Sequence, residues 1–175
     1  MEIPELLPGD IILSRSNAPI SRLIRWFGKK QTGNARVSHA AMAVSNKLLT
    51  ESLFRVTVGP IAKYHGQPCI VYRMVGLSDH EREMIALKAV SVEGKRYGWA
   101  KIPLFALDSL FRTYLFTSRV GVTSFKVCSE LIAWAYEKTL AYKPFGLGWR
   151  SISPDIIDDY CSHSAYWNVI YDNLA

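Results

Sequence analysis

Residues 125–138 read FKVCSELIAWAYEK, and the rest of the chain is organised around this stretch. After the cysteine, apolar residues recur at helical spacing, at Leu131, Ile132, Ala135 and Tyr136. This spacing predicts a helix with a buried stripe and places Cys128 in its first turn. The partial positive charge and unpaired N–H groups of a helix N-terminus favour thiolate over thiol, so the pattern predicts a reactive cysteine. The alternative is a small residue that only packs, because free cysteine is among the most buried residue types.

Length and composition predict one globular domain over residues 1–175. Hydrophobic residues make up 49% of the chain, which is enough for a core and excludes a disordered protein. No apolar run approaches the roughly 18 residues that span a bilayer. The N-terminus also lacks the basic and apolar regions of a secretion signal. We therefore expect a cytoplasmic protein, with delivery by another route left open.

The cysteines are three in number and scattered, at Cys69, Cys128 and Cys161. An odd, scattered set argues against a disulfide framework and for a reducing compartment. No CxxC or HExxH pattern occurs, so we expect no metal and no cofactor.

The formal net charge is +6, and much of it lies in one part of the chain, at Arg15, Arg22, Arg25, Lys29, Lys30 and Arg36. Such a charge could meet an anionic partner or could simply be a solvated face. No nucleic-acid-binding motif accompanies it, so a nucleic-acid partner is not expected. Residues 18–27 have the pattern of an amphipathic helix, which leaves peripheral membrane contact open. The oligomeric state does not follow from the sequence.

Hydrophobic patterning predicts strands over residues 11–14, 37–44, 48–53, 54–59, 71–74 and, as an edge strand, 166–171. It predicts a helix from the capping box of Ser78 and Glu81 to about Val92 and a short helix from Ser153. Residues 100–120 are apolar and aromatic, typical of one or two helices that pack in the core or wall an apolar groove. A turn at 45–47 pairs the second and third strands as an antiparallel hairpin, so His39 and Glu51 become neighbours if they share a face.

These residues supply the parts of a thiol hydrolase. Cys128 is the candidate nucleophile, and its own N–H at the helix start is a candidate oxyanion donor. His39 is the candidate base, because imidazole titrates near neutrality. Glu51 can fix the tautomer of that imidazole by accepting a hydrogen bond. Each residue alone has a structural interpretation, and the prediction depends on their combination.

The motifs stand in a recognisable order: residues 8–13 (PGDIIL), 38–44 (SHAAMAV), 51–52 (ES), 94–98 (GKRYG), 127–132 (VCSELI) and 152–155 (ISPD). This order resembles the circularly permuted branch of the NlpC/P60 superfamily, with its YiiX-like members. In that branch the histidine strand precedes the cysteine helix, whereas ordinary papain-like enzymes have the cysteine first. The resemblance spans about residues 7–160.

The resemblance implies an α+β, papain-like fold, in which a small antiparallel sheet or half-barrel packs against helices and the nucleophile begins a helix. It implies a cysteine hydrolase with Cys128, His39 and Glu51 as its triad. Tyr97 matches the tyrosine of a Gly-x-x-Tyr segment and is expected to bind substrate, as are Ser38 and Ser129. The chain departs from the pattern at Gly98, where an acidic residue often follows that tyrosine.

The substrate stays open at this stage. A peptide or amide bond, such as one in a cell-wall fragment, ranks first, and an amide or ester of an acyl lipid is the alternative. An acyl acceptor other than water would make the protein an acyltransferase. Two non-catalytic interpretations also remain: a binding module that kept the fold, and a lipid-surface adaptor that uses Arg22, Arg25 and Lys29.

Overall fold

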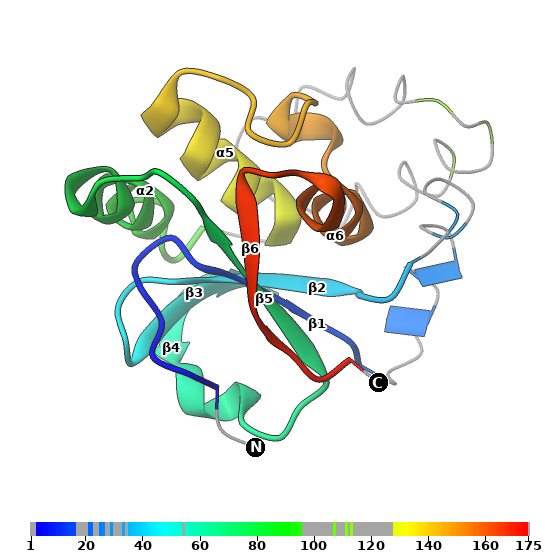
Figure 1. Ribbon diagram of the computed structural model, residues 1–175, viewed down its shortest axis with the longest axis horizontal. Coiled ribbons are helices and arrows are strands. Elements are labelled where there is room, and N and C mark those ends of the chain that lie inside the picture. Colours follow the sequence, from blue (N-terminus) through cyan, green and yellow to red (C-terminus); the bar gives the residue numbers. More distant parts are fainter. Residues whose placement is uncertain are drawn as a thin grey trace.

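Six strands form one antiparallel sheet in the order β4-β3-β2-β1-β5-β6 (Figure 1). The computed structural model describes residues 3–16, 21–22, 25–26, 29, 33, 35–53, 55–95, 107, 111, 113 and 128–174. The strands are β1 (Ile11–Ser14), β2 (His39–Ala43), β3 (Leu48–Ser52), β4 (Val56–Pro60), β5 (Cys69–Met74) and β6 (Trp167–Asp172).

The helices are α2 (Asp79–Val90), α5 (Cys128–Leu140) and α6 (Pro154–His163), and all three lie on one face of the sheet (Figure 1). Short 3₁₀ turns occur at η1 (Ile61–Tyr64) and η2 (Trp149–Ser151). The opposite face is covered by η1 and by the N-terminal segment, through Ile3 and Leu6. In the described part of the chain, no helix has the length and apolar character needed to cross a membrane.

Side-chain alternation along the central strands divides the core between these two faces. In β1, Ile11 and Leu13 pack with the helices, whereas Ile12 packs on the other side. In β2, Ala40 packs with the helices and Ala41 on the other side. Because successive side chains of a strand point to opposite faces, both faces of these strands are buried and their apolar runs are continuous.

The expected α+β class and antiparallel sheet are confirmed, with shifts at the ends of elements. The strand expected over 37–44 is shorter, β5 begins before residue 71, and β6 is an edge strand as predicted. Ser78 and Glu81 form the predicted capping box. The turns η1 and η2 carry no periodic signal and were not predicted. The helices expected over 18–27 and 100–120 fall largely outside the described residues.

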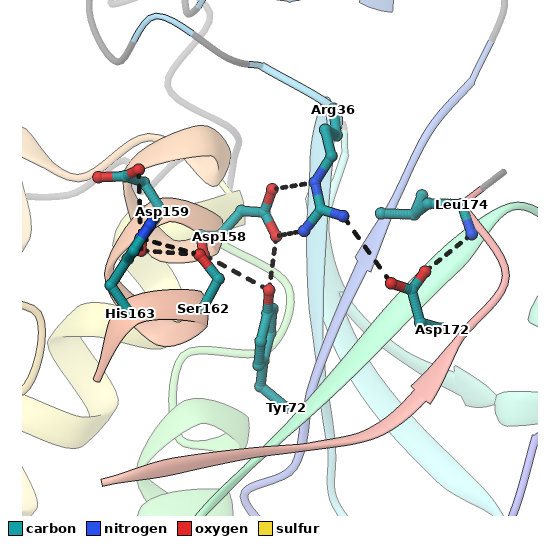
Figure 2. A network of polar contacts seen from close by, with 8 residues as sticks. All are labelled: Arg36, Tyr72, Asp158, Asp159, Ser162, His163, Asp172 and Leu174. Atoms are coloured by element: carbon teal, nitrogen blue, oxygen red, sulfur yellow. Dashed lines mark hydrogen bonds and ion pairs between the residues drawn. The ribbon is translucent and has the colours of Figure 1, made fainter. Parts of the chain in front are cut away.

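An arginine just before β2 ties distant parts of the molecule together (Figure 2). Arg36 donates to both carboxylate oxygens of Asp158 in α6, at 3.0 and 2.9 Å, and lies 3.8 Å from a carboxylate oxygen of Asp172 in β6. The Tyr72 hydroxyl donates to the same Asp158 carboxylate at 2.7 Å. These bonds, which we call the Arg36 clamp, fix the segment that leads into β2 against α6.

Candidate active site

Cys128 is the first residue of α5, as the helical spacing predicts, and it is 5% exposed. Two hydrogen bonds anchor the helix that carries it. The Ser129 hydroxyl donates to the Ile152 carbonyl at 2.8 Å, and the Tyr136 hydroxyl donates to the Gly9 carbonyl at 2.6 Å. The helix is therefore anchored by one buried contact at its start, at Ser129, and by a second further along, at Tyr136.

His39 is the first residue of β2, at one end of the sheet. The register pairs Ala41 with Glu51, so the Glu51 side chain shares the face of β2 to which residues 39 and 41 belong. His39 Nε2 lies 2.9 Å from Glu51 Oε2, and the two side chains are 15% and 5% exposed. The hairpin prediction, that these residues are neighbours, is confirmed.

Glu51 accepts hydrogen bonds from three side chains. Besides His39, the Tyr64 hydroxyl donates to Oε2 at 2.8 Å and the Lys63 ammonium donates to Oε1. Burial alone would raise the pKa of this carboxyl, but the bonds from His39, Lys63 and Tyr64 outweigh it and lower the pKa to about 2. Glu51 is therefore a fixed negative charge at neutral pH.

The side chains of His39 and Cys128 each shift the pKa of the other, which places the imidazole beside the sulfur. Because Nε2 faces Glu51, Nδ1 is the ring nitrogen left to face the sulfur. Burial would lower the pKa of His39, but the charge and hydrogen bond of Cys128, followed by those of Glu51, raise it to about 9. His39 is thus a bridge between the sulfur and the carboxylate.

The pKa of the Cys128 thiol shifts in the opposite direction to that of His39. Burial would raise the pKa of Cys128, but the charge and hydrogen bond of His39 lower it, together with hydrogen bonds from the backbone N–H groups of Ala40 and Ser129. By contrast, burial and the charge of Asp172 raise the pKa of Cys69 to about 11, and burial also raises that of Cys161. Among the three thiols, Cys128 is the one whose pKa is lowered, which favours its reactive form.

The structure brings Cys128, His39 and Glu51 together, and their catalytic roles stay predictions. The other three histidines, His65, His80 and His163, are exposed. Of the residues expected to bind substrate, Ser38 accepts a hydrogen bond from the Ser16 N–H at 3.4 Å, and Ser129 donates to Ile152. Both serine hydroxyls therefore make contacts within the protein, and Tyr97 lies outside the described residues.

The sequence did not predict the two side chains that, besides His39, donate hydrogen bonds to Glu51. Lys63 and Tyr64 lie in η1, and both donate hydrogen bonds to the Glu51 carboxylate. No periodicity marks η1, and its proximity to Glu51 arises only when the chain after β4 folds under the sheet. The pairing of Ser14 with His39 across β1 and β2 was likewise not foreseen.

Three comparisons bear on the chain. No protein-family model and no curated protein matches the sequence. Among solved structures, the fold is similar to that of yiiX (DUF1105), a protein from Escherichia coli O157:H7 described as a metalloprotein. The TM-score is 0.67 at 17% identity, over 97% of this chain and 98% of that chain. At this identity the likeness shows the fold alone, and it confirms that the fold is YiiX-like.

The residues around Cys128 do not suit a metal ion. Within the described ranges, no three His, Cys, Asp or Glu side chains gather as ligands around one point. The carboxylate that contacts His39, Glu51, already accepts from Lys63, Tyr64 and His39. A bound cation would have to displace the Lys63 ammonium and the imidazole from it, so the donor set favours an ion pair within the protein.

Proposed function

We propose that the protein is a cysteine hydrolase of the permuted papain-like type that cleaves an amide or peptide bond. One observation carries the proposal: a single imidazole bridges a thiol at a helix start and a buried carboxylate. The raised pKa of His39 and the lowered pKa of Cys128 favour a thiolate–imidazolium pair at neutral pH. This pair is the resting state from which thiol hydrolases begin.

In the first half of the reaction, the Cys128 thiolate attacks the substrate carbonyl carbon and a C–S bond forms. The developing oxyanion lies near the start of α5, where the first-turn N–H groups and the helix dipole stabilise negative charge. The His39 imidazolium then gives its proton to the leaving nitrogen, and the C–N bond breaks. A thioester and a neutral imidazole result.

In the second half, neutral His39 takes a proton from water and the hydroxide attacks the thioester. The C–S bond breaks, the acid product leaves, and the thiolate–imidazolium pair is restored. Glu51 keeps the imidazole in the correct tautomer and stabilises its cationic form throughout. An alcohol or amine in place of that water would give an acyltransferase on the same machinery.

The first test is selective alkylation. At pH 6–7, iodoacetamide should modify Cys128 ahead of Cys69 and Cys161, because only its pKa is lowered. His39→Ala should slow this modification at least tenfold, since burial then acts on the thiol without a cation beside it. Equal labelling of the three cysteines in the folded protein would leave a non-catalytic binding module as the better interpretation.

The second test is formation of the acyl-enzyme. With 4-nitrophenyl acetate as the probe, we expect a burst of 4-nitrophenolate and an acetylated protein by mass spectrometry, with the acetyl group on Cys128. Cys128→Ala should lose both signals, whereas the matched variant Cys161→Ala should keep them. A burst of equal size in the two variants would contradict the assignment of the nucleophile.

A further inference from the structure

The Glu51 carboxylate is shared by the candidate base and by a lysine that the proposed function leaves without a role. His39 Nε2 lies 2.9 Å from Oε2, and the Lys63 ammonium donates to Oε1 of the same carboxylate. Because hydrogen bonds span about 2.7–3.2 Å, two such bonds and one carboxylate separate the ammonium from the imidazole, a distance of roughly 8 Å at most. Lys63 is therefore close enough to affect the imidazole through Glu51.

The fold holds the Lys63 side chain at this carboxylate. Lys63 lies in η1, which directly follows β4 on the face of the sheet opposite the three helices (Figure 1). Its Nζ lies 5.5 Å from the centre of the Tyr64 ring, and its carbonyl accepts from the Gln67 side-chain amide at 2.8 Å. The Lys63 side chain is 36% exposed and that of Glu51 is 5% exposed. The lysine thus stands between a buried carboxylate and water.

The charges around Glu51 and His39 act in opposite directions. Cys128, from α5, and Glu51 both raise the pKa of His39. An ammonium beside a carboxylate reduces the negative potential that the carboxylate exerts on its other partners. The Tyr64 hydroxyl adds no charge, because burial and the Glu51 anion raise its pKa and keep it protonated. Lys63 therefore supplies a positive charge that opposes the effect of Glu51 on the imidazole.

We infer that Lys63 is a positioning residue of the candidate active site: by sharing the Glu51 carboxylate with His39, its ammonium weakens the hold of that carboxylate on the imidazole proton. The inference rests on the proposed function, in which His39 gives a proton to the leaving group and then takes one from water. The second step needs a neutral imidazole. In the acyl-enzyme the Cys128 charge is gone, so the balance between Glu51 and Lys63 decides how readily that neutral imidazole forms.

An NMR titration of the His39 imidazole tests the inference without a substrate. Lys63→Met should raise the pKa of His39 by about half to one unit, as expected when a unit charge roughly 8 Å away is removed from a partly solvated site. Lys63→Gln keeps a hydrogen-bond donor but loses the charge, and it should show the same rise. Lys63→Arg keeps the charge and should titrate as the native protein does.

The sign of the change separates this role from structural support. If Lys63 only held Glu51 in place, its loss would loosen the contact with His39 and the pKa of His39 would fall. Lys143→Met removes an equal charge from an exposed position after α5 and should change nothing. A rise in either neutral variant supports the inference. No rise in both, or an equal rise in Lys63→Arg, would overturn it.

Hydrolysis of the acetyl-enzyme measures the consequence for the reaction. After acetylation of Cys128 by 4-nitrophenyl acetate, mass spectrometry follows loss of the acetyl group as a function of pH. The midpoint of this profile should lie about half to one unit higher in Lys63→Met than in the native protein or Lys143→Met. Coincident profiles would contradict a role of Lys63 in the reaction. If the native protein forms no acetyl-enzyme, the proposed function fails, and the titration of His39 still decides the effect of Lys63.

Discussion

Glu51 is the residue through which the rest of the site is held. It is buried, yet hydrogen bonds from His39, Lys63 and Tyr64 keep the pKa of its carboxyl at about 2. Its charge in turn helps to raise the pKa of His39 to about 9. The Glu51 carboxylate therefore affects the Cys128 thiol indirectly: its charge raises the pKa of His39, and His39 in turn lowers the pKa of Cys128.

Glu51→Gln removes this charge and keeps the size of the side chain. The pKa of His39 should fall, and with it the fraction of thiolate at Cys128, because the imidazolium loses its anionic partner. We expect iodoacetamide to modify Cys128 roughly tenfold more slowly at pH 6, which corresponds to about one pKa unit. Glu83→Gln, an exposed position in α2, is the matched control and should react as the native protein does.

His39 should also report directly on its partner sulfur. The charge and hydrogen bond of Cys128 are the largest of the effects that raise the pKa of His39, so Cys128→Ala should lower this pKa from about 9. An NMR titration of the imidazole protons measures the change. The signals of the other three histidines should superimpose in the two proteins, and an unchanged His39 curve would show that the sulfur and the ring do not interact.

The contribution of Lys63 to the free energy of unfolding is expected to depend on pH. Because the folded-state pKa of Glu51 lies below its ordinary value of 4.5, the carboxylate contributes stability above pH 4.5 that is lost as the pH falls through about 2. Lys63→Met removes one of the bonds responsible, and because the lysine side chain is 36% exposed, we expect a cost of only about 1 kcal/mol at pH 7. Urea unfolding at pH 7 and pH 3 should show a smaller cost at the lower pH, whereas Lys47→Met should change neither value.

Among the elements, α2 supports α5 without taking part in the site. The capping box of Ser78 and Glu81 fixes its start, with the Ser78 hydroxyl accepting from the Glu81 N–H at 3.3 Å. Ser78→Ala should cost about 1 kcal/mol in the free energy of unfolding and leave the alkylation rate of Cys128 unchanged. Ser91→Ala, at the other end of α2, is the comparison and should cost less. A slower alkylation in Ser78→Ala would show that the start of α5 depends on α2.

The parts of the site that the sequence predicts are those marked by a local pattern within one helix or one hairpin. The helix at Cys128 follows from apolar spacing, and the meeting of His39 with Glu51 follows from strand alternation about the turn at 45–47. Lys63 and Tyr64 could not be placed, because η1 has no period and is positioned by packing under the sheet. The meeting of Cys128 with His39 was inferred from chemistry and resemblance, since no local pattern joins a late helix to an early strand.

For the molecule as a whole, the Arg36 clamp joins residues 122 positions apart (Figure 2). Asp158 is 5% exposed at its side chain and Arg36 is 34% exposed, so the pair lies at the edge of the core. Arg36→Met would leave the buried Asp158 carboxylate with Tyr72 as its remaining hydrogen-bonding side chain among the residues that the structure describes. We expect a cost of about 1–2 kcal/mol, below the value for a fully buried pair because water can reach the site.

Urea unfolding at pH 7 measures this cost, and Asp158→Asn is the companion variant. The double variant Arg36→Met/Asp158→Asn should cost less than the sum of the two single variants, because both remove the same interaction. Strict additivity would show that the clamp contributes no coupling between α6 and the segment before β2.

The order of elements along the chain has a consequence for biosynthesis. Strands β1 to β5 all precede α5, so the His39 imidazole and its carboxylate partner leave the ribosome well before Cys128 does. A nascent chain can therefore pair its first five strands before the helix that carries Cys128 has been made. The sheet is completed by β6 only after that helix has been made, so the contact between Cys128 and His39 forms late, when most of the sheet is already in place.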